Sequence, residues 1–144
     1  MKIAYQKLTD TALEPRRMTE HASGFDLFAD LKAAVELHPQ GIMAVPTGIA
    51  IEIPAGYEAQ IRPRSGLAIK HGLGILNSPG TIDADYRGEI KVIIINLGSL
   101  PFCIEPQMRI AQMVICPVLI PELELQPFLA PSNRQDGGFG HTGH

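Results

Sequence analysis

The sequence predicts an all-β domain of the sandwich or barrel class, and three observations carry that prediction. Glycine and proline supply 14 and 12 of the 144 residues and are scattered along the chain, so turns are frequent. Residues that break regular structure recur about every 8 to 12 positions, which is the spacing typical of β-sandwiches and barrels. Apolar and polar residues alternate in short stretches, as half-buried strands require.

The predicted strands follow one another along the chain and are separated by turn residues. Alternation is clearest at residues 50–53 and 58–62, where every second residue is apolar. Residues 90–95 are nearly all apolar and β-branched, which fits a strand buried on both faces or one packed at a subunit interface. The expected strands cover residues 3–8, 25–29, 49–53, 58–62, 89–96 and 109–117.

One short helix is expected at residues 65–71, with Ser65 as its cap and Gly72 at its end. The last segment changes character, because residues 131–144 are polar and rich in glycine. In isolation such a segment is a flexible tail. We therefore expect a β domain at residues 1–130 and a flexible C-terminal arm at residues 131–144.

Composition limits the classes of function. A net charge of −3 argues against wrapping a nucleic-acid backbone, which needs a basic surface. The N-terminal residues lack the pattern of a secretion signal, and no long uncharged apolar stretch occurs, so we expect a cytoplasmic protein with no membrane span. Cys103 and Cys116 have no partner at metal-ligand spacing and are expected to be buried small hydrophobic residues.

A candidate phosphate site lies where a predicted strand meets the predicted helix. Arg64, Ser65 and Gly66 combine a guanidinium, a hydroxyl and the amides of a helix start, which suit phosphate oxygens. The alternative is that Ser65 only caps the helix.

Two further stretches offer chemistry. Asp83 and Asp85 share one side if their segment is extended, and a carboxylate in a pocket can take a proton from water; the alternative is that both form a turn. Near the C-terminus, Arg134 supplies charge and Phe139, set among glycines, could stack on a planar ligand. The alternative there is a disordered tail.

Taken together, five ordered segments resemble the motifs of the trimeric dUTP pyrophosphatase (dUTPase) family. They occupy residues 22–27, 63–68, 72–88, 109–112 and 134–143 and read ASGFDL, PRSGLA, GLGILNSPGTIDADYRG, RIAQ and RQDGGFGHTG. The resemblance implies a distorted jelly-roll-like β fold assembled as a homotrimer. It also implies active sites shared between subunits, with the C-terminal arm closing over a neighbour's site.

The resemblance further implies hydrolysis of dUTP to dUMP and pyrophosphate. By analogy, Asp83 activates the water that attacks the α-phosphorus, Tyr86 packs on the sugar and rejects a 2′-hydroxyl, and Asn77 with nearby backbone reads uracil. Mg²⁺ would be bound chiefly by the phosphates and water, with Asp26 ordering its water shell. The remaining implied substrate-binding residues are Arg64, Ser65, Gly66, Thr81, Ile82, Gln112, Arg134, Phe139, Gly140, His141 and Thr142.

The chain departs from the family pattern at four places. A usual glycine and acidic residue before Arg109 are replaced by Gln107 and Met108, and Gln135 replaces a glycine. His141 replaces a serine, and we expect its ring N–H to contact the γ-phosphate instead. The fourth is the conservative order of residues 22–23, Ala-Ser in place of Ser-Ala.

Two other functions remain open at this point. A dCTP deaminase would share the fold but attack the base, and a non-catalytic nucleotide sensor would keep the site without turnover. Asp83 followed by Asp85 and Tyr86, together with the glycine-rich last motif, favours cleavage of the phosphate chain.

Overall fold

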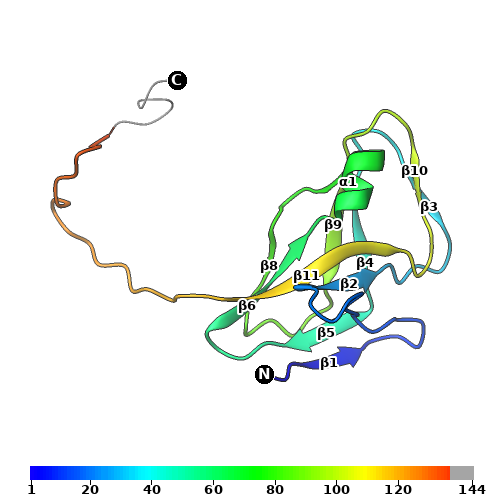
Figure 1. Ribbon diagram of the computed structural model, residues 1–144, viewed down its shortest axis with the longest axis horizontal. Helices are drawn as coiled ribbons and strands as arrows, with labels where there is room; N and C mark the ends of the chain where they lie inside the picture. Colours follow the sequence, from blue (N-terminus) through cyan, green and yellow to red (C-terminus); the bar gives the residue numbers. More distant parts are fainter. Residues whose placement is uncertain (137–144) are drawn as a thin grey trace.

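The computed structural model describes residues 1–136, and its regular structure consists almost entirely of short strands (Figure 1). One helix, α1, spans Ser65–His71, as predicted. The strands are β1 (Ala4–Lys7), β2 (Gly24–Phe28), β3 (Val35–Leu37), β4 (Ile42–Pro46), β5 (Ile49–Glu52), β6 (Tyr57–Arg62), β7 (Leu73–Ile75), β8 (Gly80–Ile82), β9 (Lys91–Asn96), β10 (Phe102–Ile104) and β11 (Arg109–Pro117).

The strands form four antiparallel sheets, and within the described residues none of these closes into a barrel. The largest has the order β2-β11-β6-β8, and the next has the order β4-β9-β7. Two smaller sheets pair β1 with β5 and β10 with β3. The all-β, jelly-roll-like class is confirmed, in an open arrangement of sheets packed on a common core.

The predicted apolar strand at residues 89–96 corresponds to β9 and is buried on one face. Val92, Ile94 and Asn96 are buried in the core, whereas Ile93 and Ile95 on the opposite face are only partly covered. The expectation of burial on both faces is wrong for this chain by itself. The partly covered face remains available to line a cavity.

Helix α1 begins one residue earlier than the predicted cap implies. Arg64 is the N-cap, with an extended backbone and no side-chain cap hydrogen bond, so Ser65 is already the first helical residue. The prediction that Ser65 caps the helix is therefore wrong, and its side chain stays exposed. Gly72 ends the helix in the left-handed region with φ of 69°, and a Cβ there would lie 2.6 Å from the Gly98 backbone nitrogen.

Two of the departures from the family pattern keep a glycine-like backbone. Gln107 has φ of 61° and Gln135 has φ of 49°, both in the region that glycine adopts most easily. The turn at Gln107 is held by backbone hydrogen bonds in which its N–H donates to Ala29 O at 2.8 Å and Met108 O accepts from Ala29 N–H at 2.8 Å. The sequence change therefore preserves the turn at some cost in strain.

The two cysteines are not core residues. Cys103 is exposed and Cys116 is only partly covered, which contradicts their predicted burial. The middle residue of β10 points away from the core while Ile104 points into it, so a local apolar run did not define the buried positions. Within residues 1–136 the structure holds no helix long and apolar enough to cross a membrane.

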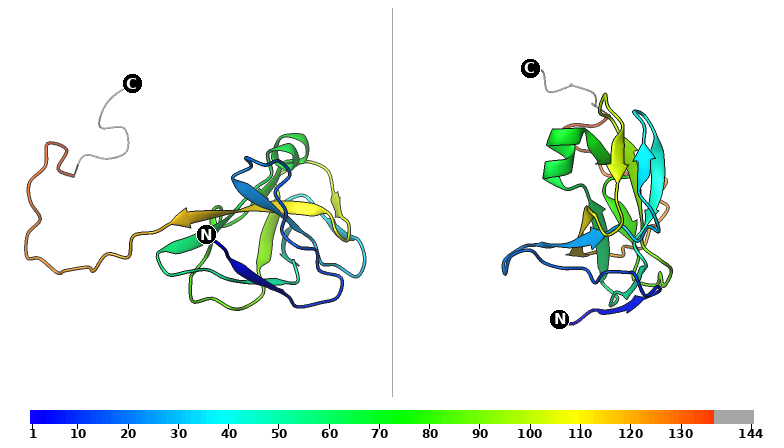
Figure 2. Two further views of the ribbon diagram at one scale, coloured as in Figure 1. Left: turned by 60° about the horizontal axis from the view of Figure 1, so that its bottom comes forward. Right: turned by 90° about the vertical axis from the view of Figure 1, so that its right-hand side faces the viewer.

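The segment after β11 leaves the body of the domain (Figures 1 and 2). Residues 121–136 are all exposed. Large apolar side chains there are 80 to 97% exposed, namely those of Leu119, Ile120, Leu123, Leu125, Phe128 and Leu129. Apolar side chains spread along an extended segment are typical of a chain that packs on another surface. The domain boundary at residue 130 stays a prediction.

Candidate active site

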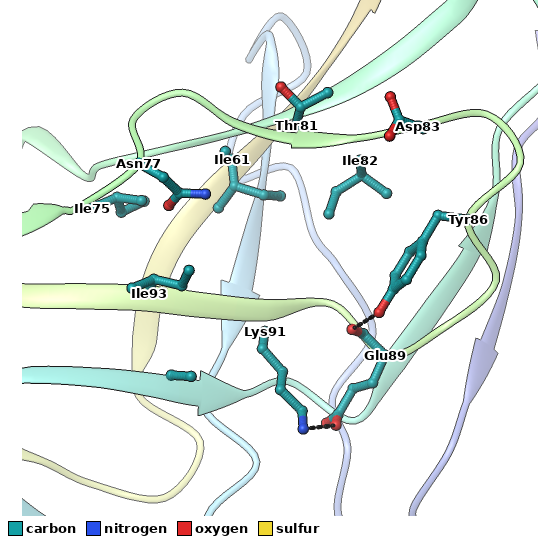
Figure 3. Close-up of a pocket in the computed structure, with 12 residues that line it drawn as sticks. Ile61, Ile75, Asn77, Thr81, Ile82, Asp83, Tyr86, Glu89, Lys91 and Ile93 are labelled. Carbon is teal, nitrogen blue, oxygen red and sulfur yellow. Dashed lines mark hydrogen bonds and ion pairs between the residues drawn. The ribbon is translucent and has the colours of Figure 1, made fainter.

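A pocket of about 390 Å³ lies between the two larger sheets (Figure 3). Its residues come from β4, β6, β7, β8 and β9 and from the turns that precede β8 and β9. It brings together five of the predicted site residues, Asn77, Thr81, Ile82, Asp83 and Tyr86. It also contains residues that were not predicted as site residues, namely Ala44, Ile61, Ile75, Gly80, Glu89, Lys91 and Ile93.

The floor of this pocket is apolar and its rim is polar. Ile61 and Ile75 are buried, and Ile93 presents the partly covered face of β9. Asn77 lies on the rim in the turn before β8, and its amide nitrogen is 3.3 Å from where a Cβ on Gly80 would stand. A flat apolar floor beside an amide suits a planar heterocycle that carries hydrogen-bonding groups at its edge.

Asp83 opens a turn rather than continuing an extended strand. The Tyr86 N–H donates to the Asp83 carbonyl oxygen at 3.2 Å, so the assumption that Asp83 and Asp85 share one side of an extended segment does not hold. Asp83 is exposed and lines the pocket; it also lines a second hollow of about 520 Å³ together with Glu58 and Asp85. An exposed carboxylate at the mouth of a pocket can accept a proton from water.

Tyr86 forms one wall of the pocket. Its hydroxyl donates to the Glu89 carbonyl oxygen at 3.0 Å, and its ring lies so close to Gly88 that a Cβ there would meet ring atoms. The side chain is 44% exposed, which leaves part of the ring facing the pocket. The ring can therefore act as a rigid surface for a ligand.

A second group of predicted residues surrounds the end of β6. The Asp26 carboxylate is only 14% exposed and pairs with Arg109 at 3.1 Å and with Arg64 at 3.6 Å. The Arg64 guanidinium also donates to the Arg109 carbonyl oxygen at 2.9 Å, and the Gln112 amide donates to Pro63 O at 2.9 Å. These bonds hold two cations and an amide close to Ser65 and Gly66, at the start of α1.

Arg109 belongs to this group although no role was predicted for it from the sequence. Its place follows from the pairing of β11 with β2, in which Arg109 lies opposite Phe28, two residues from Asp26. With Arg64 and Arg109 on one carboxylate, the group carries a net positive charge, which suits phosphate oxygens.

The two groups do not meet within one chain. The pocket lining does not include Asp26, Arg64, Ser65, Gly66 or Gln112. Ile82 pairs with Ala59 in the β6–β8 ladder, so Asp83 and Arg64 lie at opposite ends of that ladder. Five residues of extended chain from Ala59 to Arg64 span on the order of 15–20 Å. The structure thus separates the predicted base and sugar residues from the predicted phosphate residues.

The residues present fit a metal ion that arrives with its ligand. Within residues 1–136 no three His, Cys, Asp or Glu side chains are grouped to hold a metal ion. Magnesium keeps several waters and is commonly bound through one or two carboxylates plus substrate phosphates, which requires little more than Asp26.

Arg134 lies in the exposed C-terminal segment, and Phe139, Gly140, His141 and Thr142 fall outside the described residues.

Comparison with known proteins gives one consistent result for the sequence. The dUTPase family model matches residues 10–143. A deoxyuridine 5′-triphosphate nucleotidohydrolase from Hydrogenobaculum sp. is 57% identical over 143 residues, which cover 99% of each chain. An enzyme of the same name from Chlamydia pneumoniae is 55% identical over 130 residues, 90% of each chain.

Comparison of structures agrees with this result. The Staphylococcus bacteriophage 80alpha dUTPase bound to dUPNHPP superposes with a TM-score of 0.88 and 29% identity over 99% of each chain. A dUTPase from phage phi11 of S. aureus, described with a structural Mg(II) ion, gives a TM-score of 0.80 and 27% identity over 89% of this chain and 98% of the other. With its fold, its pocket and its motifs in agreement, the chain belongs to the dUTPase family of enzymes.

Proposed function

We propose that the protein hydrolyses dUTP to dUMP and pyrophosphate by attack of an Asp83-activated water on the α-phosphorus. The observation that carries the proposal is the single pocket that unites Asn77, Asp83 and Tyr86 in a member of this family. The reaction would keep uracil out of DNA and supply dUMP for thymidylate synthesis.

The proposal gives a task to Asn77, Tyr86 and Asp83 in this pocket. Uracil would lie on the apolar floor with its edge at Asn77 and the backbone of Thr81 and Ile82. The deoxyribose would pack on the Tyr86 ring, whose closeness leaves no room for a 2′-hydroxyl. Asp83 would then stand beside the α-phosphorus, where a carboxylate that takes a proton from water contributes about 10² to 10⁴ in rate.

We further propose that the phosphate residues come from a neighbouring copy in a homotrimer. Groups that bind one phosphate must lie within about 3 Å of it, and Arg64 of the same chain stands at the far end of the β6–β8 ladder from Asp83. A neighbour's Arg64, Ser65, Gly66 and Gln112 can meet this need if its β6 end faces the pocket. The exposed apolar segment at 119–129 supports assembly, since it has little to pack on in its own chain.

A bound Mg²⁺ would offset the charge of the triphosphate and hold it in one geometry. Asp26 is the described residue that would order its water shell. Arg64 and Gln112 would bind phosphate oxygens directly. Arg134 and Phe139, with Gly140, His141 and Thr142, would close over the nucleotide from the arm of a third copy.

One experiment separates this function from its rivals. The purified protein is offered dUTP, dCTP, dTTP and UTP with magnesium in ¹⁸O water, and pyrophosphate, ammonia and label are followed. We expect pyrophosphate from dUTP alone and the label in dUMP. Ammonia from dCTP would indicate a deaminase, and tight binding of a non-hydrolysable dUTP analogue without turnover would indicate a sensor. Label found only in pyrophosphate would refute attack at the α-phosphorus.

A further inference from the structure

The Tyr86 wall is held in place by the residues that follow it. Its ring folds back over Gly88, and its hydroxyl reaches the Glu89 carbonyl oxygen at 3.0 Å (Figure 3). The position of the ring therefore depends on where the backbone of Glu89 lies. Because Tyr86 is 44% exposed, packing by itself does not fix the ring.

The Glu89 backbone is held both by the peptide that it shares with Ile90 and by its own side chain. One carboxylate oxygen accepts the Gly48 N–H at 2.9 Å, and the other lies 3.6 Å from the Lys91 ammonium. The carboxylate is only 25% exposed and the ammonium is 56% exposed, so the bond to Gly48 is the better protected contact. A hydrogen bond from a backbone N–H to a charged acceptor is among the stronger kinds.

The turn that carries Gly48 is rigid. Gly48 is buried with φ of 64°, and a Cβ there would lie 2.6 Å from the Ala12 Cβ and 2.5 Å from an Asp30 carboxylate oxygen. Its carbonyl accepts the Leu8 N–H at 2.7 Å. The N–H of Gly48 is thus aimed by packing on both sides, and Glu89 is the acceptor that it meets.

The next residue adds a second anchor to the same turn. The Ile90 N–H donates to the Ile49 carbonyl oxygen at 2.8 Å, and the Thr47 hydroxyl donates to the Ile90 carbonyl oxygen at 2.7 Å. Ile90 and Thr47 are both buried. The β4–β5 turn therefore holds Ile90, the residue that directly follows Glu89 in the chain.

We propose that Glu89 is a positioning residue that fixes the Tyr86 ring through its bond to Gly48 and so sets discrimination between deoxyribose and ribose. This inference rests on the proposed function, because it names a determinant of specificity for that reaction. Glu89 does not touch the reacting atoms. It ties the Tyr86 ring, which would contact the sugar, to the buried turn that carries Gly48.

The test compares Glu89→Ala with Glu89→Gln, whose amide oxygen can still accept the Gly48 N–H. Glu36→Ala, which removes an exposed strand glutamate of β3, is the matched control. We expect the ratio of kcat/KM for dUTP to that for UTP to fall roughly three- to tenfold in Glu89→Ala, the range expected for loss of one hydrogen bond. Glu89→Gln should stay within about twofold of the parent protein. An unchanged ratio in Glu89→Ala would overturn the proposal.

A second measurement needs no turnover. The chain has 3 tyrosines and no tryptophan, so 3-fluorotyrosine labelling gives a simple ¹⁹F spectrum in which Tyr86→Phe identifies the Tyr86 signal. We expect the chemical shift of that signal to move toward the value of the unfolded chain in Glu89→Ala and to stay unchanged in Glu89→Gln. A signal that stays in place in Glu89→Ala contradicts the proposal.

The two readouts separate the inference from the proposed function. If the parent protein does not cleave dUTP, the proposed function fails while the ¹⁹F signal still decides whether Glu89 holds the ring. If Glu89→Ala does not fold, Glu89→Asp replaces it, because its carboxylate is one methylene too short to reach Gly48. The same shift is expected there, and its absence counts against the proposal.

Discussion

Mixing two inactive variants should restore activity if the site is divided between copies as proposed, because the β6–β8 ladder separates its residues within one chain. Asp83 and Arg64 lie at opposite ends of the β6–β8 pairing, on the order of 15–20 Å apart by strand geometry. On the proposed function, one catalytic unit takes Asp83 from one copy and Arg64 from another. Asp83→Asn and Arg64→Ala each remove one half, and each variant by itself should be nearly inactive.

The restored fraction follows from counting. In a ring of three copies refolded from an equimolar mixture, a site works only when the first copy supplies an intact Asp83 and the next supplies an intact Arg64. Each condition holds for half of the copies, so about one quarter of the sites should be active. Both variants should fold, since Asp83 is exposed and Asp26 keeps its pairing with Arg109 when Arg64 is truncated.

The assay is turnover of dUTP after joint refolding, compared with the two variants refolded separately. Asp83→Asn mixed with Asn77→Ala is the matched control, because both residues line the same pocket of one chain. The turnover of that mixture should equal only the mean turnover of the two variants refolded separately. If the Asp83→Asn and Arg64→Ala mixture also stays at its average, the reasoning that the site is divided between copies is wrong.

The remaining predictions concern selectivity, the arm and two turns. Tyr86→Ala should keep turnover of dUTP but cleave UTP more readily, measured as the ratio of kcat/KM for the two. A protein ending at Pro131 should have native circular dichroism and poor turnover; normal turnover would contradict the role of the arm. Gly48→Ala should lose about 2 kcal/mol or more of folding stability in a denaturant titration, because its left-handed backbone and crowded Cβ position resist a side chain. Gln107→Gly should gain about 0.5 kcal/mol, since relief of a left-handed residue outweighs the extra freedom of glycine when unfolded.

Most of the secondary structure could be predicted because its signals are local. Alternation placed β5 and β6 to within a residue or so, and the predicted strand at 109–117 coincides with β11. The strands that were missed are mostly three residues long, such as β3, β7 and β10. A three-residue strand is too short to show a period, and its partners, not its own sequence, define it.

β8 was missed for a different reason. Its residues, Gly80–Ile82, belong to a stretch rich in turn formers, and the turn that begins at Asp83 follows directly. Pairing with β6 supplies the hydrogen bonds that make it a strand. Local propensity is a weak guide wherever such tertiary pairing decides the outcome.

The residue types of the candidate site were visible in the sequence, but their division into two groups was not. Motifs give order along the chain, and they place Arg64 only 19 positions before Asp83. Antiparallel pairing of β6 with β8 turns that short separation into opposite ends of one ladder. Residues near in sequence thus become distant in space, and the proposed site, which uses both, is completed by another copy of the chain.

The unpredicted members of the pocket follow the same logic. Glu89 carries no signal in the sequence, because its acceptor role depends on Gly48, which is 41 residues away. Gly48 itself looks like an ordinary turn residue until its crowded surroundings are known. A residue that acts by holding another can be found only from the contact it makes. A residue that binds substrate can often be predicted from its residue type and its motif. For this reason the resemblance to the family motif led to Asp83 and Tyr86, and only the fold led to Glu89, the residue proposed to hold Tyr86 in place.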